Sequence, residues 1–293
     1  MANSIWNEIR AYPKVFPQPL KPPHSIWVIA HRGASKDAPE NTLPAMELAI
    51  EQGADMIELD VCVSKDGELV VHHDRTLRRT TNGTGRVSQK TLAELKALDA
   101  GSWFDPRFEG VQIPTLREVL EVTAGKIMLN VEIKKEAVHS AQQDFEEKLL
   151  DLLDEFQMIE HTMVSSFNTL TLVRVKEINP KVSTALLYGN TVRTNIRPKI
   201  PIYGYQAYQL VLRTRADSLN VRRNLVTRGF LKRSRETGVR IHTFTVDQPK
   251  TMKRLIRRQV NGIITNCPTR LQNWLQKQQA KGKGPRFFKK KTR

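Results

Sequence analysis

Residues 26–63, which read IWVIAHRGASKDAPENTLPAMELAIEQGADMIELDVCV, contain two short apolar runs separated by a segment of helical period. The runs Ile26–Ala30 and Met56–Val63 are predicted strands, and Leu43–Gln52 between them is a predicted helix. A strand, a helix and a second strand in this order are typical of a parallel βαβ unit. We therefore expect the rest of the chain to follow the same rhythm.

The alternation of strand-like and helix-like segments continues to about residue 280. Six further apolar runs predict strands at Lys126–Ile133, Thr162–Ser166, Val182–Tyr188, Ser218–Val221, Val239–Val246 and Gly262–Ile264. Helical periods predict helices at Ser140–Phe156, Leu170–Ile178, Leu225–Thr237, Thr251–Gln259 and Thr269–Gln278. Eight strands in about 250 residues favour a closed (β/α)8 TIM-type barrel over an open doubly wound sheet. The absence of a GxGxxG turn in the first unit also weakens the dinucleotide-binding alternative.

Three segments depart from this rhythm. Residues 75–114 are rich in turn residues, with a short helix expected near Thr91–Leu98, and we interpret them as an insertion on one loop of a barrel that spans residues 26–280. Residues 1–25 are rich in proline and are expected to form an extended arm. Residues 281–293, KGKGPRFFKKKTR, hold seven basic groups and no acidic ones, and predict a disordered tail or a weak membrane anchor.

The composition excludes several classes of protein. With 39% hydrophobic and 26% charged residues, the chain has the apolar content of a globular protein rather than a disordered one. Two cysteines are too few for a disulfide framework. No run approaches the roughly 18 apolar residues of a membrane helix, and no signal-peptide pattern opens the chain. We therefore expect a cytoplasmic location.

The charge is divided unevenly along the chain. Residues 1–190 carry a net charge of −6, whereas residues 191–293 hold 26 Lys and Arg against 3 Asp and Glu, a net charge of +23. A basic region of this size favours an anionic partner, such as a phosphate substrate, nucleic acid or the acidic inner face of a membrane, to which the basic C-terminal region would attach peripherally. The alternative is a solvated surface that only keeps the protein in solution.

Charged side chains follow or end the predicted strands, where a barrel gathers them at one face. Seven such residues are candidates for one shared pocket: His31, Arg32, Glu58, Asp60, His73, Glu132 and Lys134. Taken singly, each has a structural explanation, such as a surface salt bridge or a hydrogen-bonded histidine. Together they favour a site, because uncompensated charge buried at strand ends is costly.

Groups of these kinds restrict the chemistry of such a pocket. Three carboxylates repel one another unless a cation neutralises them, and hard oxygen ligands suit Mg²⁺ or Ca²⁺. An arginine and a lysine beside that cation favour an anionic substrate, with phosphate as the best geometric match to guanidinium. Two histidines can divide the acid and base work near neutral pH. The sequence therefore predicts metal-assisted cleavage of a phosphoester.

Several motifs resemble those of the glycerophosphodiester phosphodiesterase family, over about residues 26–272. They are Ile29-Ala-His-Arg-Gly-Ala-Ser, Pro39-Glu-Asn-Thr, Glu58-Leu-Asp-Val, Val70-Val-His-His-Asp, Arg79-Thr-Thr-Asn-Gly-Thr-Gly, Leu98-Asp-Ala-Gly-Ser-Trp-Phe, Asn130-Val-Glu-Ile-Lys, Phe244-Thr-Val-Asp and Gly262-Ile-Ile-Thr-Asn-Cys-Pro. The resemblance implies a (β/α)8 barrel that hydrolyses glycerophosphodiesters, such as glycerophosphocholine or glycerophosphoethanolamine, to glycerol 3-phosphate and an alcohol.

By the same resemblance, residues of this chain take the family's roles. His31 and His73 match the general acid and base, whereas His72 is expected to be structural. The matched metal ligands, which imply Mg²⁺ or Ca²⁺, are Glu58, Asp60 and Glu132. Arg32 and Lys134 match positions that contact the phosphate, and Phe244, where the family often has Trp, is expected to pack against the glycerol end of the substrate.

Other functions stay open at the level of sequence. A lysophospholipase D would perform the same chemistry on a lipid at a membrane surface. A nucleic-acid-binding protein would use the basic half but would leave the histidines and carboxylates unexplained, so no specific nucleic-acid partner is expected. Asn261 and Asn266 stand where the family's last strand motif usually has acidic residues, which places substrate preference in question.

Overall fold

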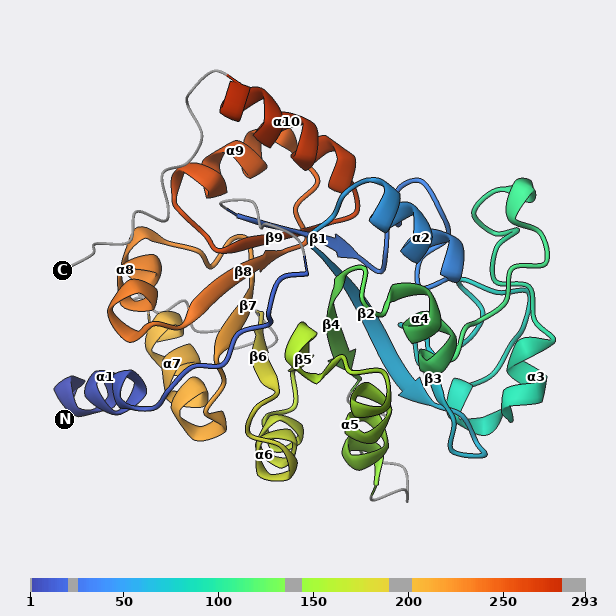
Figure 1. Ribbon diagram of the computed structural model, residues 1–293, viewed down its shortest axis with the longest axis horizontal. Helices are drawn as coiled ribbons and strands as arrows, with labels where there is room; N and C mark the ends of the chain where they lie inside the picture. Colours follow the sequence, from blue (N-terminus) through green and yellow to red (C-terminus); the bar gives the residue numbers. More distant parts are fainter. Residues whose placement is uncertain (1, 21–25, 135–143, 190–201, 281–293) are drawn as a thin grey trace.

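The computed structural model describes residues 2–20, 26–134, 144–189 and 202–280. Eight parallel strands form a closed barrel: β1 (Trp27–His31), β2 (Met56–Val63), β4 (Met128–Ile133), β5 (Thr162–Ser166), β6 (Ser183–Tyr188), β7 (Ser218–Arg222), β8 (Arg240–Phe244) and β9 (Gly262–Thr265). Each pairs with the next in this order, and β1 closes the barrel by pairing with both β2 and β9. The predicted (β/α)8 barrel is confirmed (Figure 1).

Strand periodicity explains which side chains face the barrel interior. On β2, Met56 joins an apolar cluster with residues of the other barrel strands, such as Met128 and Met163, which marks the inner face. The alternate residues, Ile57 among them, pack outward with helix residues such as Leu120. Because successive side chains of a strand point to opposite faces, the inner face of β2 also receives the residues two and four positions after Met56.

Helices surround the barrel on its outer side (Figure 1). They are α2 (Leu43–Glu51), α4 (Leu116–Thr123), α5 (Phe145–Glu155), α6 (Thr169–Ile178), α7 (Ile202–Thr214), α8 (Arg228–Thr237), α9 (Pro249–Arg257) and α10 (Pro268–Ala280). Local sequence sets several of their starts. Thr115 and Glu118, for example, form a reciprocal capping box that satisfies two backbone donors at the start of α4.

The predicted insertion follows a short strand, β3 (Leu69–Val71), which pairs antiparallel with β2. It contains the short helix α3 (Leu92–Lys96), as expected, and two single-turn 3-10 helices, Val87–Gln89 and Pro106–Phe108. Its apolar side chains form a small core of their own that includes Leu77, Leu95 and Ile113. In Figure 1 this segment lies beside β3, at the edge of the molecule.

The prediction of an extended arm at residues 1–25 is wrong in its first part. Residues 2–11 form a helix, α1 (Ala2–Ala11), which packs against α7 and α8. Ile5, Trp6 and Ile9 are buried in this contact, and burial of such an apolar stripe is what stabilises a short helix. Helices α4 and α7 were also not predicted. The predicted tail 281–293 and the first residues of the helix predicted at Ser140–Phe156 lie outside the described residues.

None of the described helices combines the length and apolar character needed to span a membrane.

Candidate active site

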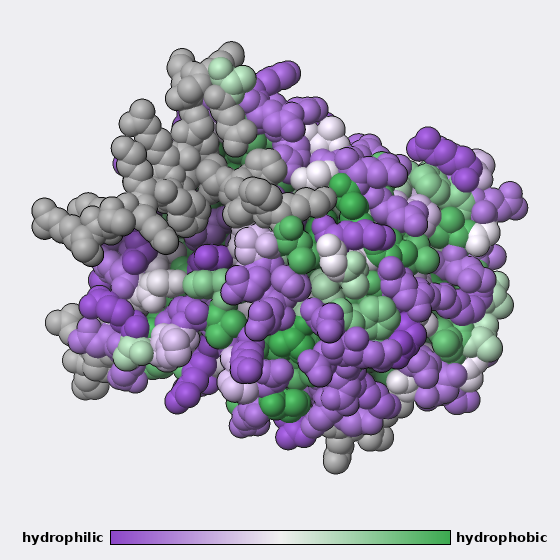
Figure 2. All heavy atoms as spheres, viewed as in Figure 1, coloured by the Kyte–Doolittle hydropathy of each residue, from purple (hydrophilic) through white to green (hydrophobic). Residues whose placement is uncertain are grey.

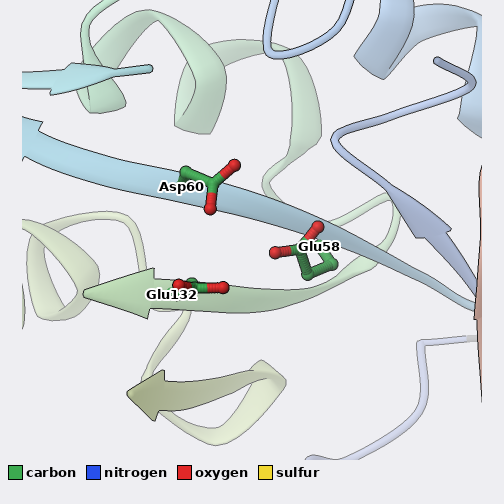
Figure 3. Close-up of side chains that lie close together, drawn as sticks. All are labelled: Glu58, Asp60 and Glu132. Carbon is green, nitrogen blue, oxygen red and sulfur yellow. The ribbon is translucent and has the colours of Figure 1, made fainter. Parts of the chain in front are cut away.

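Three buried carboxylates come together on neighbouring strands of the barrel. Glu58 and Asp60 lie two residues apart on β2, so both point inward, and Glu132 lies on β4 directly beside Asp60. Ligand oxygens of the three carboxylates lie within 4.8 Å of one another. Figure 3 shows the three side chains gathered in front of these two strands. The sequence predicted this convergence.

The electrostatics of the cluster fit a divalent cation. Burial raises the pKa of Glu58 and of Glu132, and the negative charge of Asp60 raises both further. Burial would also raise the pKa of Asp60, but Lys134 and Arg32 hold it well below its usual value. Among the described residues, the three buried carboxylates form ion pairs with two cations, Arg32 and Lys134, and their oxygens are the hard ligands that Mg²⁺ and Ca²⁺ prefer. The three predicted metal ligands fit such an ion.

Two basic side chains lie against these carboxylates. The Nζ atom of Lys134 lies 2.8 Å from Glu132 Oε1 and 3.2 Å from Asp60 Oδ1. The Nε atom of Arg32 lies 3.2 Å from Asp60 Oδ2, and its backbone N–H donates to Glu58 Oε2 at 3.0 Å. Both predicted phosphate-contacting residues thus lie at the cluster. Burial alone would lower their pKa values, but the neighbouring carboxylates raise them, so both side chains stay cationic.

The loop after β1 holds Arg32 in an uncommon backbone conformation. Arg32 has φ of +57° and Asn41 has φ of +59°, both in the left-handed region that side chains other than glycine rarely adopt. Asn41 N–H donates to Arg32 O at 3.0 Å, and its side-chain amide donates to Asp60 Oδ2 at 2.9 Å. Between them Gly33 is required, because a Cβ there would lie 2.5 Å from Ala45 O. Strain of this kind is common at functional sites.

His31 ends β1 with one ring nitrogen engaged. Its Nδ1 lies 2.6 Å from Asn266 Oδ1, while Asn266 Nδ2 donates to Asp247 Oδ2 at 2.8 Å. Since the amide oxygen can only accept, Nδ1 carries the proton and Nε2, 3.9 Å from Glu58 Oε2, is left free. Burial, and the charge of Arg32, lower the pKa of His31.

His73 is oriented in the same way by a carboxylate. Its Nδ1 lies 2.6 Å from Asp74 Oδ1, so Nδ1–H donates and Nε2 is free of this bond. Burial lowers the pKa of His73; the charge of Asp60 opposes this shift, and the charges of Lys134 and Arg32 add to it. His72, by contrast, is buried between Thr80 Oγ1 at 3.1 Å and Asp74 O at 2.9 Å. The prediction that His72 is structural agrees with these contacts.

A chain of ion pairs links the two histidine loops, and the sequence did not reveal it. Glu40 accepts from Arg32 Nη1 at 2.6 Å and from Arg79 Nη2 at 2.7 Å. Arg79 Nε donates in turn to Asp74 Oδ2 at 2.6 Å, and Asp74 holds His73. Arg79 belongs to the insertion, so this segment helps to orient the histidine. The Arg79-Thr-Thr motif marked the residue but gave no role for it.

Phe244, at the end of β8, packs against the apolar cluster inside the barrel. The partly exposed ring of Phe167, which follows β5, meets it edge-on with ring centroids 6.3 Å apart. The two rings form an apolar surface at the ends of their strands.

Fold and site together define a class. A parallel barrel that holds a buried carboxylate cluster with two cations against it is typical of an enzyme that binds an anionic substrate. A family model described as the glycerophosphoryl diester phosphodiesterase family matches residues 31–270. The chain belongs to this family and is an enzyme of it.

Individual relatives agree with this assignment. A glycerophosphodiester phosphodiesterase of Caldanaerobacter subterraneus is 41% identical over 251 residues, which cover 85% of this chain and 98% of the relative. A glycerophosphodiester phosphodiesterase of Bacillus subtilis is 33% identical, with 85% and 86% covered. Among solved structures, a phosphodiesterase of Oleispira antarctica in complex with the product sn-glycerol-3-phosphate has a TM-score of 0.72 at 28% identity, with 84% and 94% covered.

Proposed function

We propose that this enzyme hydrolyses glycerophosphodiesters such as glycerophosphocholine or glycerophosphoethanolamine to glycerol 3-phosphate and the free alcohol. The observation that carries the proposal is the carboxylate cluster flanked by Arg32 and Lys134, with His31 at the end of the neighbouring strand β1. A similar structure holds glycerol 3-phosphate as its product, which supports the substrate class.

Glu58, Asp60 and Glu132 would hold a divalent cation, Mg²⁺ or Ca²⁺. When bound, that ion supplies Lewis-acid polarisation of the phosphoryl group. Arg32 and Lys134 bind the remaining negative charge of the phosphate. Both cations are paired with acidic neighbours. A bound ion would engage those carboxylates, which leaves the two cations available to the phosphate. Phe244 packs against the glycerol end of the substrate.

His31 and His73 divide the proton transfers. The Nε2 of one neutral ring takes the proton from the attacking hydroxyl as the new P–O bond forms. The other ring, which enters the step protonated on Nε2 as well as on Nδ1, donates its Nε2 proton to the departing alkoxide as the old P–O bond breaks. The attacking hydroxyl is that of water, or the glycerol 2-hydroxyl, which would give a cyclic phosphate before water opens it. In both rings a fixed Nδ1–H directs Nε2 as the reactive atom.

Substituting the two histidines tests this division of roles. His31→Ala and His73→Ala should each lower kcat for glycerophosphocholine between about 10²- and 10⁴-fold, because positioned acid–base catalysis contributes that much. His161→Ala is the matched control, since His161 lies in a single-turn helix before β5 and its ring hydrogen-bonds only to Gln18 O within the described residues. A folded His31→Ala enzyme with near wild-type turnover would remove the assignment.

Chelation tests the carboxylate cluster separately. EDTA should abolish the turnover of glycerophosphocholine, and added Mg²⁺ or Ca²⁺ should restore it, because without the ion three buried carboxylates repel an anionic substrate. Turnover is measured by coupled detection of glycerol 3-phosphate. Full activity after exhaustive chelation would contradict a metal-dependent reaction.

A second candidate is the same chemistry on a lipid, as a lysophospholipase D. The net charge of +23 in residues 191–293 favours it, because a basic region would bring a cytoplasmic enzyme to the anionic inner face of the membrane. Comparing the kcat/KM of lysophosphatidylcholine with that of glycerophosphocholine decides between the two substrates. A higher value for the lysolipid would make the lipid the substrate.

A further inference from the structure

A groove of about 730 Å³ opens on the outer surface between α8 and α9. Its charged lining is basic throughout, with residues from both helices: Arg228, Arg235, Lys250, Lys253, Arg254 and Arg257. All six are exposed. A seventh, Arg258, is half-buried and donates from Nη1 to Val226 O at 2.6 Å, which ties the end of α9 to the loop before α8. The groove therefore gathers seven positive charges on one surface.

These charges have no local counter-charge. No acidic residue lines the groove, and α9 contains none. The one acidic residue of α8, Glu236, is already paired with Arg233 at 2.7 Å and with Lys232 at 3.9 Å. Within the part of the chain that the structure describes, none of the six exposed groove cations forms an ion pair. A partner from outside the chain would supply the missing negative charge.

The spacing of the basic residues along α9 brings like charges close together. Lys250 and Arg254 are four residues apart, as are Lys253 and Arg257, so each pair lies on one side of the helix. Like charges at this spacing destabilise a helix. The helix is retained because Met252, Leu255 and Ile256 are buried in the barrel core on its opposite side. Since these apolar residues are buried, the surface that α9 exposes to a partner is charged and has no apolar face.

The chemistry of the lining distinguishes between anionic partners. Single-stranded nucleic acid is bound by basic grooves with aromatic residues on which the bases stack, and no aromatic residue lines this groove. A membrane surface needs only a cluster of about four to eight basic residues, often on a helix. The helix α10 lies beside α9 in Figure 1, and the thirteen residues that follow it contain seven more basic groups.

We propose that the groove between α8 and α9 docks onto the anionic headgroups of a phospholipid membrane. The proposal rests on the peripheral membrane contact put forward above, and it assigns that contact to a folded surface rather than to residues 281–293. Each groove cation that nears the headgroups contributes about a fivefold gain in the membrane partition coefficient. Binding by this surface is electrostatic, so it weakens as ionic strength rises.

The test is the partitioning of the full chain onto vesicles of phosphatidylcholine with and without phosphatidylserine. The groove variant combines Lys253→Gln, Arg254→Gln and Arg257→Gln, and should lower the partition coefficient about 100-fold, by three fivefold steps. The matched control combines Lys65→Gln, Arg86→Gln and Lys126→Gln, three exposed cations that do not line the groove. A tail variant combines Lys289→Gln, Lys290→Gln and Lys291→Gln.

The proposal stands if the groove variant alone shows the large loss and still hydrolyses soluble glycerophosphocholine at the wild-type rate. The groove proposal is overturned if the groove variant binds like the control, or if only the tail variant fails to bind. In either case the more general proposal of a peripheral membrane contact would survive. Absence of wild-type binding overturns both membrane proposals and leaves the hydrolysis untouched. Tighter binding to a DNA duplex than to anionic vesicles at equal salt would assign the groove to nucleic acid instead.

Discussion

Asn266 determines which ring nitrogen of His31 is engaged in a hydrogen bond within the barrel. Its side-chain amide is itself fixed, because Nδ2 donates to Asp247 Oδ2 and its backbone N–H donates to Asp247 Oδ1. The amide oxygen therefore points at His31 Nδ1 and requires a proton there. An amide at this position directs the tautomer without adding a fourth negative charge near the cluster.

Replacing Asn266 with alanine should slow the reaction without weakening substrate binding. An ordinary hydrogen bond contributes about 1 kcal/mol, so loss of the one to His31 should lower kcat roughly three- to tenfold while KM stays nearly constant. The control is Asn261→Ala, which removes a bond to Ile241 N–H at the start of β8. That variant should lose stability and keep its kcat. An unchanged kcat in Asn266→Ala would show that the amide does not orient the ring.

The sequence predicted the site residues whose positions follow from strand periodicity, and missed those that depend on distant contacts. Glu58 and Asp60 share a face because they are two apart on a strand. Asn266 and His31 are 235 residues apart in the sequence, and Glu40 and Arg79 are 39 apart. No local sequence pattern therefore predicts either contact. The partners that orient the histidines are for this reason visible only once the chain is folded.

Among the elements, α1 is a short amphipathic helix that the sequence pattern did not predict. Its apolar stripe consists of Ile5, Trp6 and Ile9, too few residues to establish a helical period, and a proline-rich segment follows it. The stripe is buried only when α1 packs against α7 and α8. There the Trp6 ring lies edge-on to the Tyr208 ring, with centroids 5.2 Å apart, and the Arg233 Cζ atom lies 4.6 Å from the Trp6 ring centroid. Tertiary burial, rather than propensity, therefore stabilises this helix.

Trp6→Ala tests how far α1 contributes to the stability of the barrel. Truncating a buried tryptophan costs about 3–5 kcal/mol in the free energy of unfolding, measured by urea denaturation, and kcat should not change because α1 is remote from the site residues. The matched control is Trp103→Ala in the insertion, whose ring is 40% exposed, and the loss there should be smaller. Equal losses for the two variants would contradict a stabilising contact between α1 and the barrel.

At the scale of the whole molecule, the closed barrel was predictable because eight apolar runs alternate with segments of helical period, but the arrangement of its surface was not. Closure depends on β1 pairing with β9, at the other end of the chain. Figure 2 shows hydrophilic residues over most of one face, with apolar residues in small separate groups. The net charge of +17 combines a net charge of −6 over residues 1–190 with one of +23 over residues 191–293, whose basic residues gather on the later helices.

A histidine inside the barrel couples the stability of the whole fold to pH. His242 stacks on Trp27 with ring centroids 5.4 Å apart, and its Nδ1 lies 3.0 Å from Asn220 Oδ1. Gly262 leaves room for the ring, since a Cβ there would lie 2.7 Å from His242 Cδ2. Complete burial, with a smaller effect of Arg240, lowers the pKa of His242 to about 3 from the usual 6.5.

Because the folded pKa is the lower one, the unfolded chain binds one more proton between about pH 3 and 6.5, and His242 lowers stability as pH falls through this window. One proton corresponds to a slope of about 1.4 kcal/mol per pH unit in the free energy of unfolding. His242→Gln should reduce the slope between about pH 4 and pH 6 by that amount, whatever its effect on stability at neutral pH. Urea denaturation of both proteins across this range measures the slopes. Parallel curves would mean that His242 takes up its proton in the folded barrel as readily as in the unfolded chain.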